Sequence, residues 1–227
     1  MLNRYYDKKR VAEKIRNNQH RSLVGGLWHE LGSLQIQYLK NQGLSPDTRL
    51  LDVGCGCFRA GVHAIGFLEP GNYYGIDISQ DLMQAGYEKE LRTAGLATRM
   101  PVSNMAVTND FNMKSFGVDF DYFIAQSLFT HLPLNHLMLC LERAKAVAQA
   151  HAKFFATFFI CGQPDQWPSA VKHKSGVTTY PDRDPYHYCH EHIAFAADRA
   201  SWTLEFIEDW DHPRGQSIAG FSPREPD

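Results

Sequence analysis

The segment from Arg49 to Asp77 constrains the fold of this chain more than any other part of the sequence. Its residues, RLLDVGCGCFRAGVHAIGFLEPGNYYGID, comprise an apolar run, a glycine-rich turn, apolar groups at helical spacing and a second apolar run. This order predicts two strands, at Leu50–Val53 and Tyr73–Ile78, joined by a helix over Phe58–Leu68. Because a crossover helix makes the strands parallel, the turn and Asp77 fall at one edge of the sheet, where open α/β sheets bind ligands.

The turn itself, Gly54-Cys55-Gly56, lets the backbone bend sharply and lets a ligand approach without meeting a side chain. A dinucleotide-binding turn needs a further glycine at G-x-G-x-x-G, and Arg59 occupies that position. A nucleotide-dependent oxidoreductase is therefore disfavoured. The other alternative is an α/β domain whose glycines serve only a tight turn, and the spacing between these glycines and Asp77 argues against it.

The pattern Asp52-x-Gly54-x-Gly56, followed by an acid at the end of the next strand, resembles motif I of the class I S-adenosylmethionine-dependent methyltransferases. This resemblance implies that S-adenosyl-L-methionine is the cofactor and that the glycine turn passes under its methionine part. It also implies that Asp77 holds the two ribose hydroxyls, a role for which a carboxylate can accept two hydrogen bonds.

A second, independent point of resemblance follows the predicted fourth strand, Phe120–Ala125. The loop after this strand, QSLFTHLP, is similar to the fourth motif of the same family, in which it touches cofactor and substrate. After the predicted third strand, Met100–Val107, the family has an acid that bonds the adenine amine and an apolar neighbour that packs on the ring. A plain turn is the alternative role there. The predicted cofactor-binding residues are Asp52, Gly54, Cys55, Gly56, Asp77, Ile78, Asp110, Phe111, Gln126 and Ser127.

The predicted fold class is α/β: a Rossmann-like, doubly wound, seven-stranded sheet, mainly parallel, with helices on both faces. A fifth strand is expected at Phe154–Ile160, and a C-terminal antiparallel hairpin at Leu204–Trp210 and Gln216–Phe221. The family usually has a proline-glycine-glycine turn before the fifth strand. This chain has Ala150-His151-Ala152-Lys153 instead, so we expect the turn to be made otherwise.

A single methyltransferase domain is predicted over residues 1–227. It comprises an N-terminal helical lid (1–45) and a core sheet (46–221) that carries a substrate-facing insert at about 162–189, because long loops inside a compact domain are usually functional. By analogy of position, the candidate substrate-lining residues are Tyr5, Tyr6, Trp28 and His29 in the lid, and Tyr186 and His187 in the insert. Packing against the core is the alternative for each of them.

Methyl transfer from a sulfonium is an in-line displacement, so the protein mainly aligns and desolvates the reactants. A nitrogen or oxygen nucleophile can also need a base, and His131 is the candidate, since the unperturbed pKa of histidine suits this task. The alternative for His131 is a histidine that caps the helix beginning at Leu134 or bonds a backbone carbonyl. The run Tyr186–Ile193, YHYCHEHI, lacks the paired spacing of zinc sites, so no metal is expected.

Composition bounds the partners and the compartment. The net charge of −2 gives no long-range field for nucleic acid, and no apolar run approaches the roughly 20 residues that span a bilayer. The N-terminus lacks the apolar segment of a signal peptide, and five scattered cysteines favour free thiols. The prediction is a cytoplasmic enzyme that methylates an O or N atom of a small molecule, without nucleic-acid or membrane partners. The alternative is an inactive module on the same fold that binds the cofactor or a partner.

Overall fold

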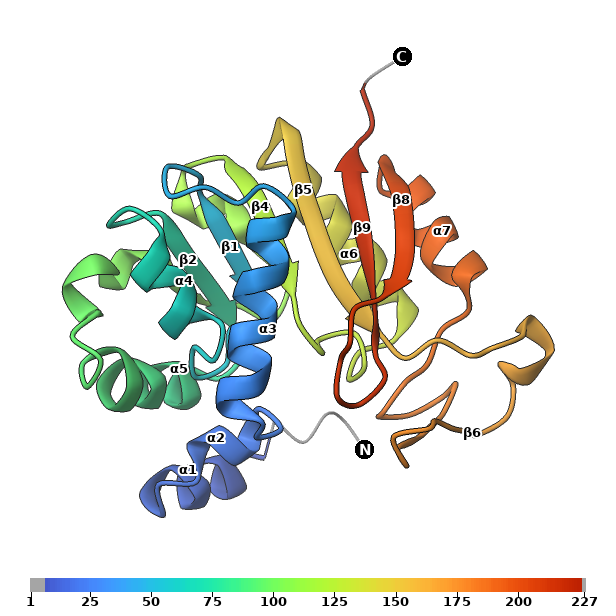
Figure 1. Ribbon diagram of the computed structural model, residues 1–227, viewed down its shortest axis with the longest axis horizontal. Helices are drawn as coiled ribbons and strands as arrows, with labels where there is room; N and C mark the ends of the chain where they lie inside the picture. The colour runs from blue at the N-terminus through green and yellow to red at the C-terminus, as the bar shows by residue number, and fades with distance from the viewer. Residues whose placement is uncertain (1–6, 226–227) are drawn as a thin grey trace. The chain divides into compact units, whose positions relative to one another are not determined.

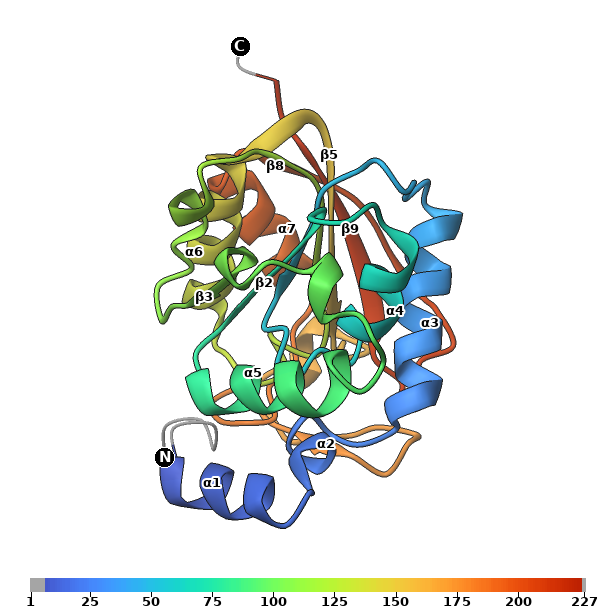
Figure 2. The ribbon, with the colours of Figure 1, turned by 90° about the vertical axis from the view of Figure 1, so that its left-hand side faces the viewer.

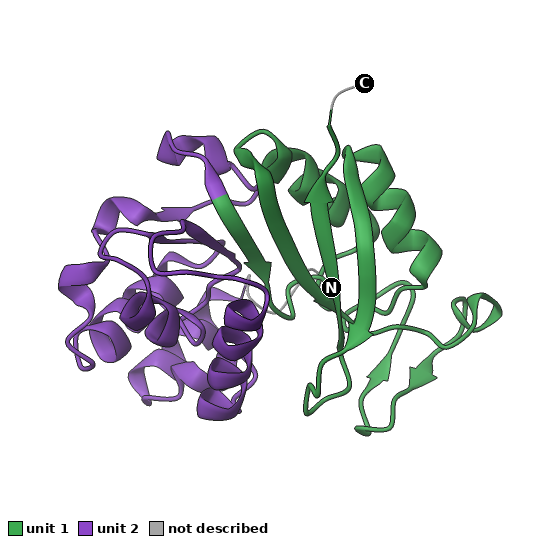
Figure 3. Cartoon of the chain, turned by 45° about the horizontal axis from the view of Figure 1, so that its top comes forward, with its two compact units in different colours: residues 1, 121–227 green, residues 2–120 purple. Residues whose placement is uncertain are grey.

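The computed structural model of this 227-residue chain describes residues 7–225. They form two compact units (Figure 3). The first unit in chain order ends at Phe120 and is purple in Figure 3, where the key labels it unit 2; the second begins at Asp121 and is green, labelled unit 1. The first unit contains α1 (Lys8–Arg16), α2 (His20–Leu23), α3 (Trp28–Asn41), β1 (Leu50–Val53), α4 (Gly61–Phe67), β2 (Tyr73–Asp77), α5 (Gln80–Gly86), a π-helical turn (Tyr87–Leu91) and β3 (Met105–Val107) (Figure 1). From β4 (Phe120–Ala125) onward follow α6 (Leu134–Lys145), β5 (Ala148–Phe158), β6 (Val171–Lys172), β7 (Thr178–Thr179), α7 (His190–Arg199), β8 (Trp202–Asp209) and β9 (Ser217–Pro223).

The first unit is built around β1, whose four residues are all buried. This burial explains why β1 reads as a continuous apolar run with a single acid rather than as an alternating strand. β1 pairs in parallel with β2, with Leu51 opposite Tyr74, and β2 pairs in parallel with β3, with Ile76 opposite Ala106. In the same unit α3 packs beside α4 (Figure 2).

The second unit contains the predicted antiparallel hairpin. β9 lies between β5 and β8 and is antiparallel to both, with Ala156 of β5 opposite Ala219. A β-bulge shifts the register of β8 at residues 204–206, and there the Phe206 ring lies over Gly220. A Cβ atom on Gly220 would be 2.5 Å from the ring, so only glycine fits this position.

The strand order is β3-β2-β1-β4-β5-β9-β8, and β6 and β7 form a separate two-stranded sheet. A mainly parallel seven-stranded sheet that ends in an antiparallel hairpin is what the sequence predicted, so the predicted fold class is confirmed. Whether the whole chain is one domain stays a prediction. Within residues 7–225, no helix is long and apolar enough to cross a bilayer.

Three predicted boundaries were wrong. α4 begins at Gly61 rather than at Phe58, because Phe58 has a φ of +67° and cannot belong to a right-handed helix. β5 begins at Ala148, so residues 150–153 are part of the strand and the turn lies just after the last residue of α6. Residues 97–104 are mainly 3₁₀ turns, which leaves β3 only three residues long.

Candidate functional site

The glycine turn and Asp77 are bonded directly to each other. Gly54 and Gly56 have φ values of +81° and +55°, which favour glycine. The backbone N–H of Gly56 donates to Asp77 Oδ2 at 2.9 Å, and that of Ser79 donates to Asp77 Oδ1 at 2.8 Å. One carboxylate therefore fixes both the turn after β1 and the start of α5. Because a carboxylate oxygen has more than one lone pair, each oxygen can accept a further hydrogen bond.

Two acids of this region differ in their surroundings. Asp77 is half-buried, and burial raises its pKa, while the bonds from the Ser79 and Gly56 backbone act against this shift. Asp52 is 4% exposed and accepts a 2.7 Å hydrogen bond from the Tyr73 hydroxyl. Burial raises the pKa of Asp52 to about 7, and the bond from Tyr73 lowers it in part. Asp52 is thus a buried support of the turn, whereas Asp77 is accessible to a ligand.

Asp110 and Phe111 lie directly after β3, as predicted. Thr108 links them to Asp77, because its backbone N–H donates to the Asp77 carbonyl at 3.0 Å. Its hydroxyl donates to Asp110 Oδ1 at 2.6 Å. Phe111 is buried at a φ of +58°, whereas Asp110 is exposed. The loop therefore begins at the same end of the sheet as the glycine turn, and the adenine-binding role of these two residues stays a prediction.

Residues 20–26, here called the strap, cover the glycine turn. A Cβ atom on Gly56 would be 2.6 Å from Val24 Cγ1, so the side chain of Val24 lies against this glycine. Arg59 Nη1 donates to the carbonyls of Val24 at 2.7 Å and Gly26 at 3.1 Å. Arg59, which stands where a dinucleotide-binding turn has glycine, therefore binds the strap.

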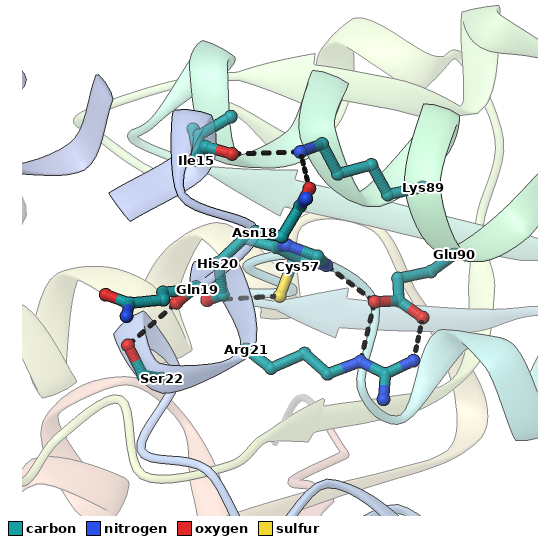
Figure 4. A network of polar contacts seen from close by, with 9 residues as sticks. All are labelled: Ile15, Asn18, Gln19, His20, Arg21, Ser22, Cys57, Lys89 and Glu90. Carbon is teal, nitrogen blue, oxygen red and sulfur yellow. Dashed lines mark hydrogen bonds and ion pairs between the residues drawn. The ribbon is translucent and has the colours of Figure 1, made fainter. Parts of the chain in front are cut away.

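A buried acid holds the start of the strap (Figure 4). Glu90 is 6% exposed; His20 Nε2 lies 2.6 Å from its Oε1, and Arg21 donates from Nε and Nη2, each at 2.7 Å. Burial acts to raise the pKa of Glu90, but the bonds from Arg21 and His20 outweigh it, so this pKa lies below its ordinary value. Next to it, Lys89 Nζ donates to the Ile15 carbonyl at 2.9 Å. The π-helical turn thereby anchors α2 and the end of α1.

In the second unit, the loop after β4 is held by a polar network. Ser127 has a φ of +55°, and its backbone N–H donates to Thr157 Oγ1 at 2.7 Å. The Ser127 hydroxyl donates to Gln216 Oε1 and accepts from Gln126 Nε2, both at 3.0 Å. The buried Oε1 of Gln126 has no hydrogen-bond partner among the described residues. Such an atom is costly to leave unpaired, so it suits contact with a ligand donor.

The same loop brings His131 against the insert. His131 Nδ1 lies 2.7 Å from Asp184 Oδ1, and the two side chains are 14% and 23% exposed. The backbone N–H of Tyr186 donates to the Thr130 carbonyl at 2.7 Å, and the Tyr188 hydroxyl donates to the Leu132 carbonyl. Two predicted residues, His131 and Tyr186, therefore lie in adjoining segments.

Three other predicted substrate contacts differ in their surroundings. His187 is 1% exposed, with its ring nitrogens 2.8 Å from Thr179 Oγ1 and 3.0 Å from the Trp167 carbonyl. Trp28 is buried in a cluster with Cys57 and Leu82, whereas His29 is exposed. Substrate contact by these residues stays a prediction, and Tyr5 and Tyr6 lie outside the described residues.

Within residues 7–225, no group of three or more His, Cys, Asp or Glu side chains is placed to hold a metal ion. All five cysteines are buried free thiols.

Solved structures of other proteins have a fold similar to that of this chain. No protein-family model matches the sequence. Among solved structures, the magnesium protoporphyrin IX methyltransferase of Synechocystis PCC 6803 with bound SAH superimposes with a TM-score of 0.61 at 14% identity, covering 86% of this chain and 85% of that chain. An S-adenosylmethionine-dependent methyltransferase of Clostridium acetobutylicum ATCC 824 gives 0.66 at 10% identity, covering 94% and 99%. The CcbJ methyltransferase of Streptomyces caelestis gives 0.63 at 11% identity, covering 86% and 90%. This chain has the class I methyltransferase fold.

Within this methyltransferase fold, sequence reasoning missed four residues that shape the candidate site. They are Val24 and Arg59, which tie the strap to the glycine turn, Glu90, which anchors it, and Asp184, which pairs with His131. Arg59 was noticed only as a departure from a dinucleotide motif. The other three had no local signal, because their partners lie between 32 and 70 residues away along the chain.

Proposed function

We propose that this chain binds S-adenosyl-L-methionine at the glycine turn and transfers its methyl group to an O or N atom of a small molecule. The observation that carries the proposal is the bond between the Gly56 backbone and Asp77, which sets a carboxylate beside the turn at the ends of β1 and β2. Neighbours of the same fold include a methyltransferase solved with SAM and with SAH.

The chemistry of the described residues supports this cofactor. Asp77 would accept hydrogen bonds from the ribose hydroxyls on the lone pairs left by Gly56 and Ser79. Gly54, Cys55 and Gly56 would lie along the methionine part, and Asp110 and Phe111 would bind the adenine. In the second unit, Gln126 and Ser127 would contact the cofactor, and the unpaired Oε1 of Gln126 would accept from a donor of the ligand. When bound, the cofactor supplies an electrophilic methyl group on a positive sulfur.

The proposed base is His131, with Asp184 as its positioning residue. A carboxylate 2.7 Å from Nδ1 favours the tautomer in which Nδ1 carries the proton and is the donor, so the basic lone pair lies on Nε2. Nε2 would take the proton from the acceptor hydroxyl or amine as the methyl group is transferred. Asp184 would also stabilise the imidazolium that forms. Tyr186, in the adjoining segment, would contact the acceptor, and Trp28, His29 and His187 remain candidates.

The partner class follows from charge and composition. A net charge of −2 favours a small-molecule acceptor over nucleic acid, and the five free thiols fit a reducing compartment such as the cytoplasm.

The chemistry is tested by incubating the protein with the cofactor and panels of phenols, carboxylic acids and amines, with detection of S-adenosylhomocysteine and methylated product. Once an acceptor is found, His131→Ala should lower kcat by about 10²–10⁴-fold, the usual range for loss of a general base. Asp184→Asn should lower kcat more than it changes KM and should shift the pH profile.

The matched control is His151→Ala, which removes an exposed histidine that also lies beside an aspartate, 2.9 Å from Asp121. This variant should retain wild-type turnover. Unchanged turnover in His131→Ala would refute the base assignment. Cofactor binding without product from any acceptor class would favour the alternative, an inactive binding module on this fold.

A further inference from the structure

Two buried cysteines lie at the base of the insert, where it leaves β5 and enters α7. Cys161 and Cys189 are 2% and 3% exposed. The Tyr188 N–H donates to the Phe159 carbonyl, and the Cys161 N–H donates to the Tyr188 carbonyl, both at 2.9 Å. These bonds pair Ile160 with Tyr188 in a parallel bridge. The next residue on each segment is a cysteine, and Cys189 is still extended, so the register sets the two cysteines opposite each other.

The general spacing of paired residues in neighbouring strands agrees with a disulfide at this position. Neighbouring strands lie about 4.8 Å apart, and residues paired in register point to the same face. Bridged cysteines usually have Cα atoms about 4.4–6.8 Å apart, a range that includes this spacing.

The two thiols also interact. Burial, and then a side-chain hydrogen bond with Cys189, raises the pKa of the Cys161 thiol to about 12. The Cys189 sulfur accepts a hydrogen bond from the backbone of His192 in the first turn of α7. Cys140 is different, since burial alone raises its pKa. The pair at 161 and 189 is therefore a structural unit, whereas Cys140 is an isolated core thiol.

We propose that Cys161 and Cys189 are a redox modification site, at which a small peroxide forms a reversible disulfide that closes the insert. This proposal does not depend on the proposed methyl transfer. Since both sulfurs are almost fully buried, the oxidant must be small, and a bulky reagent such as glutathione disulfide is a poor fit.

The step balances as a two-electron oxidation. Cys189 is the first nucleophile, because its sulfur lies at a helix N-terminus that favours developing negative charge. Its sulfur forms a bond to one peroxide oxygen as the O–O bond breaks, and the departing oxygen leaves as water with the thiol proton, giving a sulfenic acid. The Cys161 sulfur then attacks the sulfenic sulfur, the S–O bond breaks, and the hydroxyl leaves as a second water with the Cys161 proton. Two thiols are oxidised and one hydrogen peroxide is reduced.

The product would be a covalent ring that includes residues 162–188. This ring contains Asp184 and Tyr186, whose contacts with His131 and Thr130 it would help to retain. A thiol reductant would open the ring again.

The test treats the full chain with hydrogen peroxide, unfolds it, alkylates the remaining thiols with N-ethylmaleimide and maps the peptides by mass. In the wild type, with five cysteines, two sites should no longer be alkylated, and the mass of the chain should fall by two hydrogen atoms. A cross-linked peptide joining Cys161 and Cys189 should appear and should be lost on reduction. Cys140→Ser should behave in the same way. Neither Cys161→Ser nor Cys189→Ser should form a cross-linked peptide. Cys189→Ser should keep its four remaining thiols, and Cys161→Ser should lose at most one, as the sulfenic acid of Cys189.

A second readout uses the folded protein. Lys172 and Lys174 are exposed in the insert. Tryptic cleavage there should slow several-fold after peroxide treatment of the wild type and of Cys140→Ser, and should recover with dithiothreitol. Retention of all five thiols at a peroxide dose that oxidises dithiothreitol would overturn the proposal. So would equal thiol loss in Cys161→Ser, or a bridge between Cys55 and Cys57 instead.

Discussion

Replacing Gly56 with alanine should destabilise the first unit for two separable reasons. The backbone there has a φ of +55°, and a left-handed conformation costs a residue with a Cβ atom about 1–2 kcal/mol. The new Cβ would also lie 2.6 Å from Val24 Cγ1, and such overpacking typically costs about 1–3 kcal/mol. Together these effects predict that, in the ligand-free protein, Gly56→Ala lowers the free energy of unfolding by about 3 kcal/mol.

The chain offers a matched control for the backbone effect. Gly26 has a φ of +65°, and a Cβ atom placed on it meets nothing within 4 Å. Gly26→Ala should therefore lose only about 1–2 kcal/mol. In the double variant Val24→Ala/Gly56→Ala the overlap is relieved, so its loss should be smaller than the sum of the two single losses by about 1–3 kcal/mol.

Urea unfolding followed by circular dichroism measures the free energy of unfolding of Gly56→Ala, Gly26→Ala, Val24→Ala and the double variant. Equal losses for Gly56→Ala and Gly26→Ala, or strictly additive losses in the double variant, would refute the packing of the strap on the glycine turn. The double-mutant cycle of Val24 and Gly56 therefore tests whether packing within the chain, and not only ligand binding, requires glycine at position 56.

Three further results are expected. Glu90→Gln should cost about 3 kcal/mol in urea unfolding, because His20 is buried and loses its anionic partner, whereas Glu88→Gln, which removes an exposed pair with Arg92, should cost less than about 1 kcal/mol. Asp52 has a folded pKa of about 7, above its unfolded value, so its contribution to stability is present at low pH and is lost as pH rises toward and through 7. Between about pH 5 and pH 8, the free energy of unfolding of Asp52→Asn should therefore change by about 2–3 kcal/mol less than that of the wild type. An unchanged dependence of stability on pH would contradict the shifted pKa. Asp121→Asn, which changes the half-buried acid beside the exposed His151, should leave turnover unchanged, in contrast to Asp184→Asn.

Local patterns in the sequence were enough for the fold and for the placement of the glycine turn at the same end of the sheet as Asp77. β1, β2 and β4 are short buried runs bounded by turn residues, and they lie where the runs predicted them. Ser79, a serine directly before α5, is the N-cap of this helix, and its hydroxyl accepts from the Leu82 backbone at 3.3 Å. These features depend on neighbours a few residues apart, which a single sequence displays.

Features that depend on distant partners could not be predicted. The His131–Asp184 pair joins residues 53 positions apart, and the Arg21–Glu90 pair joins residues 69 apart. β5 begins at Ala148, although residues 150–153 alternate alanine with His151 and Lys153 and do not form an apolar run. In each case tertiary contacts overrode or added to the local preference.

The most direct test of the central claim is thermal unfolding with S-adenosylmethionine, S-adenosylhomocysteine or NAD added in separate samples. A ligand at 100 times its dissociation constant stabilises the folded state by about 2.7 kcal/mol, which is readily seen as a rise in Tm. We predict such a rise with both sulfur compounds in the wild type and in Asp81→Ala, an exposed acid of α5, and its loss in Asp77→Ala. No rise with either sulfur compound, or a rise with NAD alone, would contradict the assignment of the glycine turn as a methyl-donor site.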